Sequence, residues 1–266
     1  MALITLLTDF GMQDEYVGVM KGVIAGLNPD ATIVDICHRI APQDIVHGAF
    51  ILAAAYAYFP AGTVHVAVVD PGVGGRRRIL AMEHDAHRFV VPDNGLIEQV
   101  LAGGSPSAVV SVEETRYFLA SVSHTFHGRD IFAPVAARLA AGLSLSHLGP
   151  TVDPASMVSG VIPRCGFCTP TCIEGVVVAA DRFGNLMTNI DAASIDRLVQ
   201  ACPGKRMVVE LAGRHIGTIA TSYDHVPRQS SLAVIGSRGL LEISVNCGSA
   251  EEQLTAQIAD RVHVHT

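Results

Sequence analysis

The first half of the chain alternates short apolar runs with segments of helical periodicity, and this alternation restricts the fold more than any other feature. Strand-like runs cover residues 3–7, 32–36 and 64–69. Between them, residues 14–27 and 44–59 place apolar side chains at helical spacing. Strands that alternate with helices predict a mostly parallel sheet covered by helices on both faces.

The segments that follow extend the same domain. Apolar runs at residues 79–82 and 89–91 predict a hairpin, and a further helix is expected over residues 130–141. We therefore expect an α/β N-terminal domain over residues 1–155. Residues 156–170 are rich in Pro, Gly, Ser and Cys without a clear period, which is typical of a linker.

Short strand candidates at close spacing dominate the rest of the chain, and Gly and Asn separate them. The expected strands are 173–179, 186–190, 207–211, 215–221, 232–235, 241–245 and 261–265. One helix is expected among them, over residues 192–201. This pattern predicts a smaller, all-β, barrel-like C-terminal domain over residues 171–266.

Composition excludes several classes of protein. The hydrophobic set makes up 49% of the chain and charged residues 16%, unlike a disordered protein. The apolar stretch 49–58 is far shorter than the roughly 20 residues of a membrane span. The first residues lack the basic segment of a signal peptide, so we expect a cytoplasmic protein. A net charge of −7 and the absence of Trp argue against nucleic acid as a partner.

The cysteines favour free thiols over a metal or redox site. Cys165 and Cys168 form a CxxC pattern, but zinc would need a second pair, and only Cys172 follows nearby. A redox CxxC normally opens a helix, whereas Pro163 and Pro170 bracket this one. We expect buried free thiols, no metal site and no cofactor; the role of these three cysteines stays open.

Polar residues at the ends of elements are the first candidates for chemistry, because open α/β sheets bind ligands at the carboxyl ends of their strands. Asp9 follows the first strand, Asp70 follows the third, and His127 stands just ahead of a helix. An Asp, an Arg and a His that converge would suit activation of a water molecule. A turn or helix-capping role explains Asp9 equally well.

Residues 70–78, Asp-Pro-Gly-Val-Gly-Gly-Arg-Arg-Arg, form the densest candidate site. They are not a dinucleotide fingerprint, because GxGxxG would need Gly at Arg77, and they contain no GK[ST] of a phosphate-binding P-loop. A phosphate-ester substrate and a plain solvated turn both remain alternatives. In the second half, residues 181–190 and 236–239 are weaker candidates that a turn also explains.

Taken together, these dispersed motifs resemble the S-adenosyl-L-methionine (SAM) hydroxide adenosyltransferases, the adenosine-forming SAM hydrolases of the fluorinase/chlorinase superfamily. The motifs lie at residues 8–11, 34–38, 69–74, 92–95, 125–130, 181–190 and 237–239, in the family's order. The resemblance runs from about residue 3 to about residue 265. It implies an α/β domain, a β-barrel domain and homotrimers with active sites at subunit interfaces.

The resemblance also implies site residues. The family's catalytic Asp-Arg-His set corresponds to Asp70, Arg77 and His127, and the family's spacing selects Arg77 over Arg76 and Arg78. The implied substrate-binding residues are Asp9 for the ribose hydroxyls, Asp181, Ser237 and the backbone of Arg238 for the methionine end, and Asn185 and Tyr223 for adenine. The loop 246–248 is expected to bound the adenine edge.

The implied reaction is attack of water at C5′ of SAM, which releases adenosine and L-methionine. Halogenases of the same fold carry Tyr at the position of Asp70 and lack the Arg and His partners. They also differ at Gly128, where a serine is associated with fluoride, and at Gln43 and Met187, where the fluorinase has tryptophans. A non-catalytic adenosine or SAM sensor, a halogenase and a phosphate-ester hydrolase remain alternatives. Whether Asp70 or His127 is the base stays open.

Overall fold

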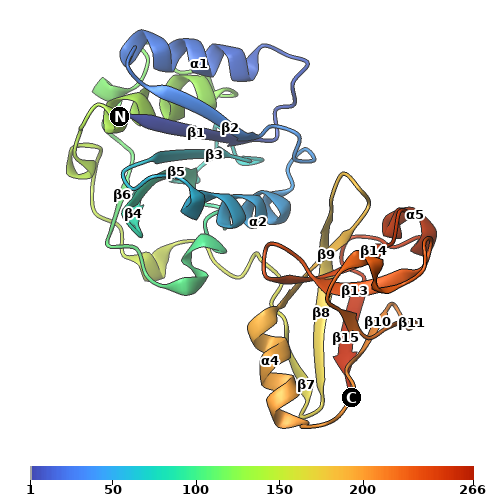
Figure 1. The fold of residues 1–266 in the computed structure, drawn as a ribbon. Helices are drawn as coiled ribbons and strands as arrows, with labels where there is room; N and C mark the ends of the chain where they lie inside the picture. Colours follow the sequence, from blue (N-terminus) through green and yellow to red (C-terminus); the bar gives the residue numbers. More distant parts are fainter. Residues whose placement is uncertain (1) are drawn as a thin grey trace. The chain divides into compact units, whose positions relative to one another are not determined.

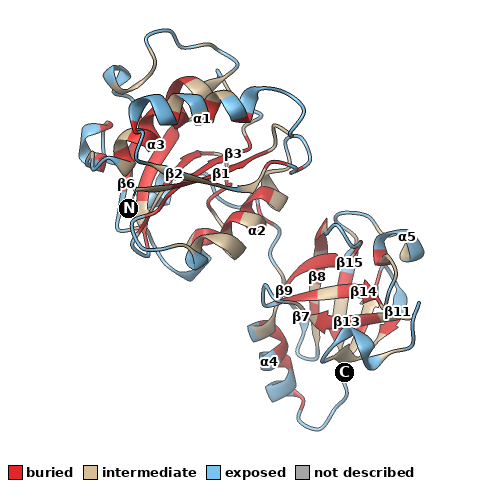
Figure 2. Cartoon of the chain, turned by 45° about the horizontal axis from the view of Figure 1, so that its top comes forward, coloured by how far each residue is buried: buried red, intermediate tan, exposed pale blue. Residues whose placement is uncertain are grey.

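The computed structural model describes residues 2–266 and divides into two compact units, Met1–Ile162 and Pro163–Thr266. The division falls inside the segment 156–170 that the sequence marks as a linker. Figure 1 shows a layered α/β unit and a unit built mainly of strands. Buried residues gather along the strands of each unit, so each has a core of its own (Figure 2).

The N-terminal unit is built on a six-stranded sheet in the order β2-β1-β3-β5-β4-β6. The strands are β1 (Leu3–Thr8), β2 (Thr32–Cys37), β3 (Val64–Val68), β4 (Ile79–His84), β5 (His87–Pro92) and β6 (Ala108–Ser111). The pairs β1–β2, β1–β3 and β3–β5 are parallel, whereas β4 runs antiparallel to β5 and β6. The sheet is therefore mixed, and β6 is a strand that the sequence analysis missed.

Helices cover both faces of this sheet (Figure 1). On one face α1 (Tyr16–Leu27) packs against α3 (Ala133–Ala140), and on the other lies α2 (Ile45–Ala55). The helix expected over 44–59 is shorter, because its last turn tightens into a 3₁₀ turn, Tyr56–Tyr58. The helix expected over 130–141 begins instead as a π-helical turn, Gly128–Phe132, that leads into α3. Such turns are frequent at functional sites.

The C-terminal unit is a nine-stranded, nearly closed, barrel-like sheet. Its strands are β7 (Gly166–Thr169), β8 (Cys172–Ala180), β9 (Leu186–Asp191), β10 (Val208–Leu211), β11 (Arg214–Gly217), β12 (Ile219–Ala220), β13 (Ser231–Ile235), β14 (Leu240–Val245) and β15 (Arg261–His265). They follow the order β11-β10-β15-β8-β9-β14-β13-β12, with β7 paired to β8. Contacts between β11 and β13 bring the ends of the sheet together.

Two helices accompany these strands, the expected α4 (Ala192–Ala201) and a short α5 (Ala250–Leu254) that was not expected. The strand expected over 215–221 is split into β11 and β12, because Gly217, the last residue of β11, takes a left-handed φ of 124°. The expectation of buried thiols is confirmed for Cys202 and wrong for Cys168 and Cys247, which are exposed; the other three cysteines, Cys37, Cys165 and Cys172, are half-buried. Within residues 2–266, no helix has the length and apolar character needed to cross a membrane.

Candidate active site

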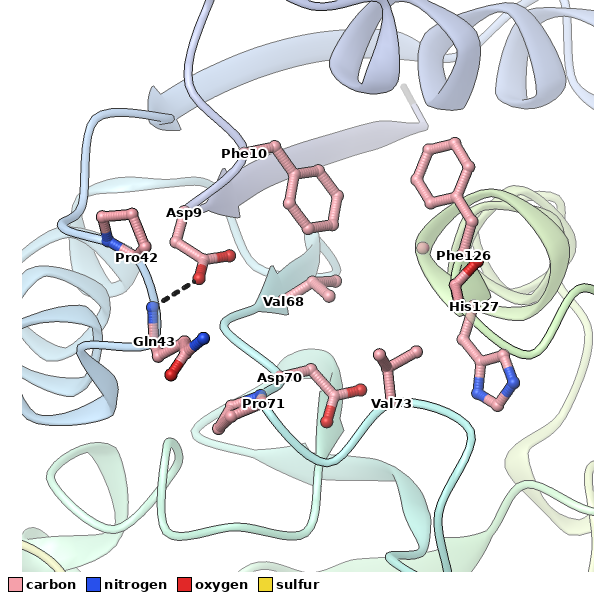
Figure 3. A pocket seen from close by; sticks show the side chains of 12 residues that line it. Asp9, Phe10, Pro42, Gln43, Val68, Asp70, Pro71, Val73, Phe126 and His127 are labelled. Atoms are coloured by element: carbon pink, nitrogen blue, oxygen red, sulfur yellow. Dashed lines mark hydrogen bonds between the residues drawn. The ribbon is translucent and has the colours of Figure 1, made fainter.

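The candidate site opens at the carboxyl ends of β1 and β3, which are parallel neighbours. Asp9 follows β1 directly, and Asp70 follows β3 after one intervening residue. A third wall comes from residues 125–128, which lead into the π-helical turn. Together they enclose a cavity of about 300 Å³, a size at the lower end for small-molecule pockets (Figure 3). The lining residues are Asp9, Phe10, Pro42, Gln43, Val68, Asp70, Pro71, Val73, Thr125, Phe126, His127 and Gly128.

Arg77 joins Asp70 and His127. Its Nε donates to both carboxylate oxygens of Asp70, at 3.0 and 2.9 Å, and its Nη2 donates to Oδ2. The same Nη2 lies 2.9 Å from Nδ1 of His127. The Asp70 side chain is 3% exposed and that of Arg77 is 11% exposed. The structure thus brings the three residues of the expected set into one hydrogen-bonded group.

The neighbouring arginines have different environments. Arg78 pairs with Asp93, with Nε 2.8 Å from Oδ2, and also donates to the backbone carbonyl of Ser156. Arg76 is exposed. Of these three consecutive arginines, Arg77 is therefore the one bonded to Asp70.

The conformation of the loop after Asp70 returns Arg77 to that carboxylate. Two overlapping turns fold the loop, with backbone bonds from Val73 to Asp70 and from Gly75 to Gly72. Gly74 has a φ of 74°, in the left-handed region that glycine tolerates. A Cβ at this position would lie 2.1 Å from the carbonyl oxygen of His124, so the loop closes tightly against the chain segment that leads to His127.

The contact with Arg77 defines the tautomer of His127. A guanidinium N–H can only donate, so Nδ1 of the imidazole accepts and the ring hydrogen of the neutral form sits on Nε2. Burial, followed by the charge of Arg77, lowers the pKa of His127 below its ordinary value, although Asp70 and Asp130 act in the opposite direction. The imidazole is therefore neutral near pH 7.

The segment that carries His127 is anchored by an ion pair next to it. Asp130 is fully buried, and it accepts from Arg129 Nε at 2.6 Å and from the backbone N–H of Ser123 at 2.8 Å. The Arg129 guanidinium also lies 5.1 Å from the ring centre of Phe126. These contacts hold the turn around His127 in place.

Asp9 faces the same cavity. Its Oδ2 accepts the backbone N–H of Gln43 at 2.8 Å, and in Figure 3 the other oxygen points toward the cavity. Gln43 has a φ of 69°, a left-handed conformation that is uncommon outside glycine. The capping alternative for Asp9 does not hold for α1, whose N-cap residue is Glu15.

An aromatic cluster that the sequence analysis did not single out forms one side of the site. Phe10, Tyr16 and Phe126 contact one another, with ring centres 5.0 to 5.9 Å apart. A Cβ added at Gly128 would lie 3.1 Å from the Phe10 ring, so glycine leaves room for this packing. The sequence signal for this cluster was the position of Phe10 next to Asp9 and of Phe126 next to His127. The cluster makes this wall apolar.

The remaining expected residues form a second group, in the C-terminal unit. Asp181 accepts from the backbone N–H groups of Phe183 and Asn185, and from the Asn185 side chain at 2.9 Å. Arg238 Nη1 lies 3.2 Å from the sulfur of Met187. Ser237 precedes Arg238 in the turn between β13 and β14. These residues thus lie in two turns, 181–185 and the turn between β13 and β14.

Tyr223 has a partner that the sequence analysis missed. Its hydroxyl donates to Oε2 of Glu242 at 3.2 Å. Burial raises the pKa of Glu242, and the charge of Asp181 adds to this, against the hydrogen bond from Tyr223 and the charge of Arg238. A Cβ at Gly236 would lie 2.0 Å from Glu242 Oε1, so the glycine next to Ser237 leaves room for this carboxylate.

Comparison with known proteins places the chain in a family. Residues 4–149 match the model of the SAM hydroxide adenosyltransferase N-terminal domain, and residues 175–263 match that of the C-terminal domain. The chain belongs to the SAM hydroxide adenosyltransferase family. Asp9, Asp70, Arg77 and His127 lie within the N-terminal match, and the Asp181 group lies within the C-terminal match.

Relatives and solved structures of this SAM hydroxide adenosyltransferase family member align with 73% to 99% of the chain. A protein of Salinispora arenicola named (R)-S-adenosyl-L-methionine hydrolase is 37% identical over 98% of this chain and 97% of its own. A solved structure of an uncharacterized conserved protein from Thermotoga maritima matches with a TM-score of 0.90 and 33% identity, over 99% of this chain and 100% of its own. A fluorinase of Actinoplanes sp. is 26% identical over 73% of this chain and 74% of its own.

Proposed function

We propose that this protein hydrolyses SAM to adenosine and L-methionine, by attack of water at C5′ of the ribose. Family membership and relatives named (R)-S-adenosyl-L-methionine hydrolase support the substrate. The observation that carries the choice of water as nucleophile is the hydrogen-bonded set of Asp70, Arg77 and His127 beside the cavity.

Asp70 is the group that receives a hydrogen bond from the attacking water. Arg77 fixes the plane of the Asp70 carboxylate, yet a carboxylate has about four acceptor positions, so room for the water remains. Because Nδ1 accepts from Arg77, neutral His127 presents an N–H at Nε2, so it donates rather than accepts. Asp70 is therefore the acceptor of the proton, and His127 orients the water.

The leaving group needs no acid. Methionine departs from C5′ as a neutral thioether when the bond to the sulfonium sulfur breaks. Its departure removes the positive charge from the sulfur, so no proton has to be supplied. The remaining difficulty is the weak nucleophilicity of water. Holding the water in line with the C–S bond, in a cavity with an apolar aromatic side, contributes several kcal/mol through proximity and orientation, on the order of the effect in intramolecular reactions.

The two ends of SAM require residues from both units. Asp9 serves the ribose hydroxyls, while Asp181, Ser237 and Arg238 serve the methionine end. Asn185 and Tyr223 serve the adenine. Because the family resemblance implies trimers, the active protein is a homotrimer in which one subunit's N-terminal unit and its neighbour's C-terminal unit share a substrate. The division of the site residues between the units supports this arrangement.

Specific contacts count against two of the alternative functions, the halogenase and the phosphate-ester hydrolase. A halide would meet the buried Asp70 carboxylate, whose negative charge repels it. A phosphate ester would need several free arginines in the glycine loop, but Arg77 and Arg78 are bonded to Asp70 and Asp93, which leaves Arg76 for this role. A sensor of SAM or adenosine would use the same binding residues without turnover.

One experiment separates these functions. Purified protein is incubated with SAM, with and without chloride and with and without EDTA, and the products are identified by mass. The hydrolase releases adenosine and methionine at a rate that neither addition changes. A 5′-chlorinated nucleoside would mark a halogenase, loss of the reaction in EDTA would mark a metal-dependent hydrolase, and tight binding without products would mark a sensor.

A further inference from the structure

The segment 34–38, Val-Asp-Ile-Cys-His, has no role in the proposed reaction, although it is one of the motifs that the sequence analysis singled out. It forms the end of β2 and the residue after it. The pairing of β1 with β2 shifts by one residue between Leu6 and Leu7, opposite this segment. Irregularities of this kind redirect side chains and are common next to active sites.

A chain of polar contacts runs from the surface of the N-terminal unit to this segment and on to β1. Lys21 Nζ lies 2.6 Å from Asp35 Oδ2, and Asp35 Oδ1 lies 3.1 Å from Nε2 of His38. Nδ1 of His38 lies 2.8 Å from the hydroxyl of Thr8. That hydroxyl accepts the backbone N–H of Phe10 at 3.2 Å. The His38 side chain is 2% exposed and Thr8 is fully buried.

The direction of each contact follows from the groups involved. The carboxylate of Asp35 only accepts, and it lies 3.1 Å from Nε2 of His38, which places the ring hydrogen on Nε2 and leaves Nδ1 to accept. The Thr8 hydroxyl then donates to Nδ1 and keeps its oxygen for the Phe10 N–H. Burial acts to raise the pKa of Asp35, but hydrogen bonds from Lys21 and His38 outweigh it and lower the pKa, which keeps the carboxylate ionised.

This series of polar contacts ends at the residues on both sides of Asp9 in the sequence. Thr8 and Phe10 are its sequence neighbours, and the backbone N–H of Gly11 donates to the carbonyl of His38 at 2.8 Å. The backbone of Asp9 is thereby tied to the end of β2 from both directions. The Asp9 carboxylate, in turn, meets the N–H of Gln43 and faces the cavity.

We propose that Thr8, His38 and Asp35 are positioning residues that set the direction of the Asp9 carboxylate for the ribose of the substrate. None of them lines the cavity. The inference rests on the proposed function for its link to SAM, whereas its structural part, the control of Asp9, does not. Loss of this series of polar contacts therefore weakens substrate binding and leaves the chemical step at Asp70 nearly unchanged.

The same strand provides a matched control. Thr5, also fully buried on β1, makes an equivalent contact, with its hydroxyl 2.7 Å from Nδ1 of the buried His65. Thr5 pairs with His65 of β3, three residues before Thr8, and lies outside the cavity lining. Thr8→Val and Thr5→Val each remove one buried Thr–His hydrogen bond, so they share the general cost of that loss.

The experiment compares Thr8→Val, Thr8→Ser and Thr5→Val in the full-length protein. Crystal structures of the three variants report the Asp9–Gln43 contact, and steady-state kinetics with SAM report KM and kcat. We expect Thr8→Val to turn Asp9 away from the Gln43 N–H and to raise KM roughly 10-fold or more, with kcat within about twofold. Thr8→Ser restores the hydroxyl and the parental KM, and Thr5→Val lowers the melting temperature with KM unchanged.

Two results would overturn the inference. One is an Asp9 carboxylate in Thr8→Val that keeps the parental contact with Gln43. The other is an equal rise of KM in Thr8→Val and Thr5→Val, which would show that any buried Thr–His contact on this strand matters alike. An inactive parent protein would instead count against the proposed function, and the structures would still decide whether Thr8 controls Asp9.

Discussion

Arg77 bonds to Asp70 and His127 through one nitrogen, because its Nη2 donates to the carboxylate and lies 2.9 Å from Nδ1 of the imidazole. The carboxylate and the imidazole thus depend on the same guanidinium group. A lysine at position 77 would bring the charge but not the planar fork that makes both contacts. The two possible bases of the site are therefore unequal, since only Asp70 retains acceptor positions.

Replacing Asp70 should impair chemistry more than binding. In Asp70→Ala the attacking water loses its acceptor, so we expect kcat to fall roughly 10²-fold or more, while affinity for SAM changes little. Single-turnover rates and isothermal titration measure the two effects separately. A variant that keeps the parental rate and loses affinity would make Asp70 a binding residue.

Replacing Asp9 should impair substrate binding more than chemistry. Asp9→Ala leaves the ribose hydroxyls without a charged acceptor, which costs about 1.5–3 kcal/mol, or roughly 10- to 150-fold in affinity. Titration with adenosine tests this directly, and 2′,3′-dideoxyadenosine is the matched ligand control. If both nucleosides lose affinity equally, Asp9 does not contact the ribose hydroxyls.

Gly74→Ala should disturb the site, whereas Gly62→Ala should not. Both glycines are left-handed, with φ of 74° and 85°, so alanine strains either backbone by about 1 kcal/mol. Only at Gly74 would the new Cβ meet the His124 carbonyl, at 2.1 Å, whereas the space at Gly62 is open. We expect both variants to melt earlier and only Gly74→Ala to lose kcat. Comparable loss of kcat in both would refute the argument from the loop.

Acid should destabilise the N-terminal unit through His65. Burial, with a smaller contribution from His87, lowers the pKa of His65 to about 3, so the folded state keeps this ring neutral while the unfolded state takes up a proton below about pH 6.5. Stability is therefore lost as the pH falls from about 6.5 toward 3. By linkage, this amounts to about 2 kcal/mol by pH 5.

Urea unfolding at pH 7 and pH 5 measures this loss, with His65→Phe as the comparison. The ring of Phe89 stacks on His65, so an aromatic residue suits the position although its hydrogen bonds to Thr5 and His87 disappear. The variant should be less stable at pH 7 and should show a smaller pH dependence. An unchanged pH dependence would assign the effect to other groups.

Oligomeric state should control activity. The proposed site draws on the N-terminal unit of one subunit and the C-terminal unit of its neighbour, so we expect activity to require the proposed trimer. Light scattering combined with dilution series of the turnover rate measures both together. A monomer that turns over SAM at the full rate would contradict the proposal.

The periodicity of the sequence predicts the elements that have a strong apolar pattern. β1, β2, β3 and α1 lie within two residues of their expected bounds, because each buries a clear apolar run or stripe. β7 was missed because all four of its residues are exposed and no alternation marks it. β6 and α5 are short, with four and five residues. Such elements depend on neighbours that a local pattern does not contain.

The candidate site was predictable to a different degree at each residue. Position after a strand indicated Asp9 and Asp70 without any resemblance. The choice of Arg77 needed the family's spacing, because three consecutive arginines are equivalent in the local sequence. In the structure, Arg78 differs from Arg77 because it is bonded to Asp93. Glu242 lies in the middle of a strand, where local sequence offers no reason to assign it to a site.

The two carboxylates of the cavity differ in what neutralises them. Asp70 faces a guanidinium, whereas the hydrogen-bond donor to Asp9 is a backbone N–H without net charge. SAM carries a sulfonium charge that adenosine lacks. In the proposed reaction, the attraction between Asp9 and the substrate therefore has a part that disappears when the C–S bond breaks. We expect turnover to weaken the binding of the nucleoside, so that Asp9 favours both substrate capture and product release.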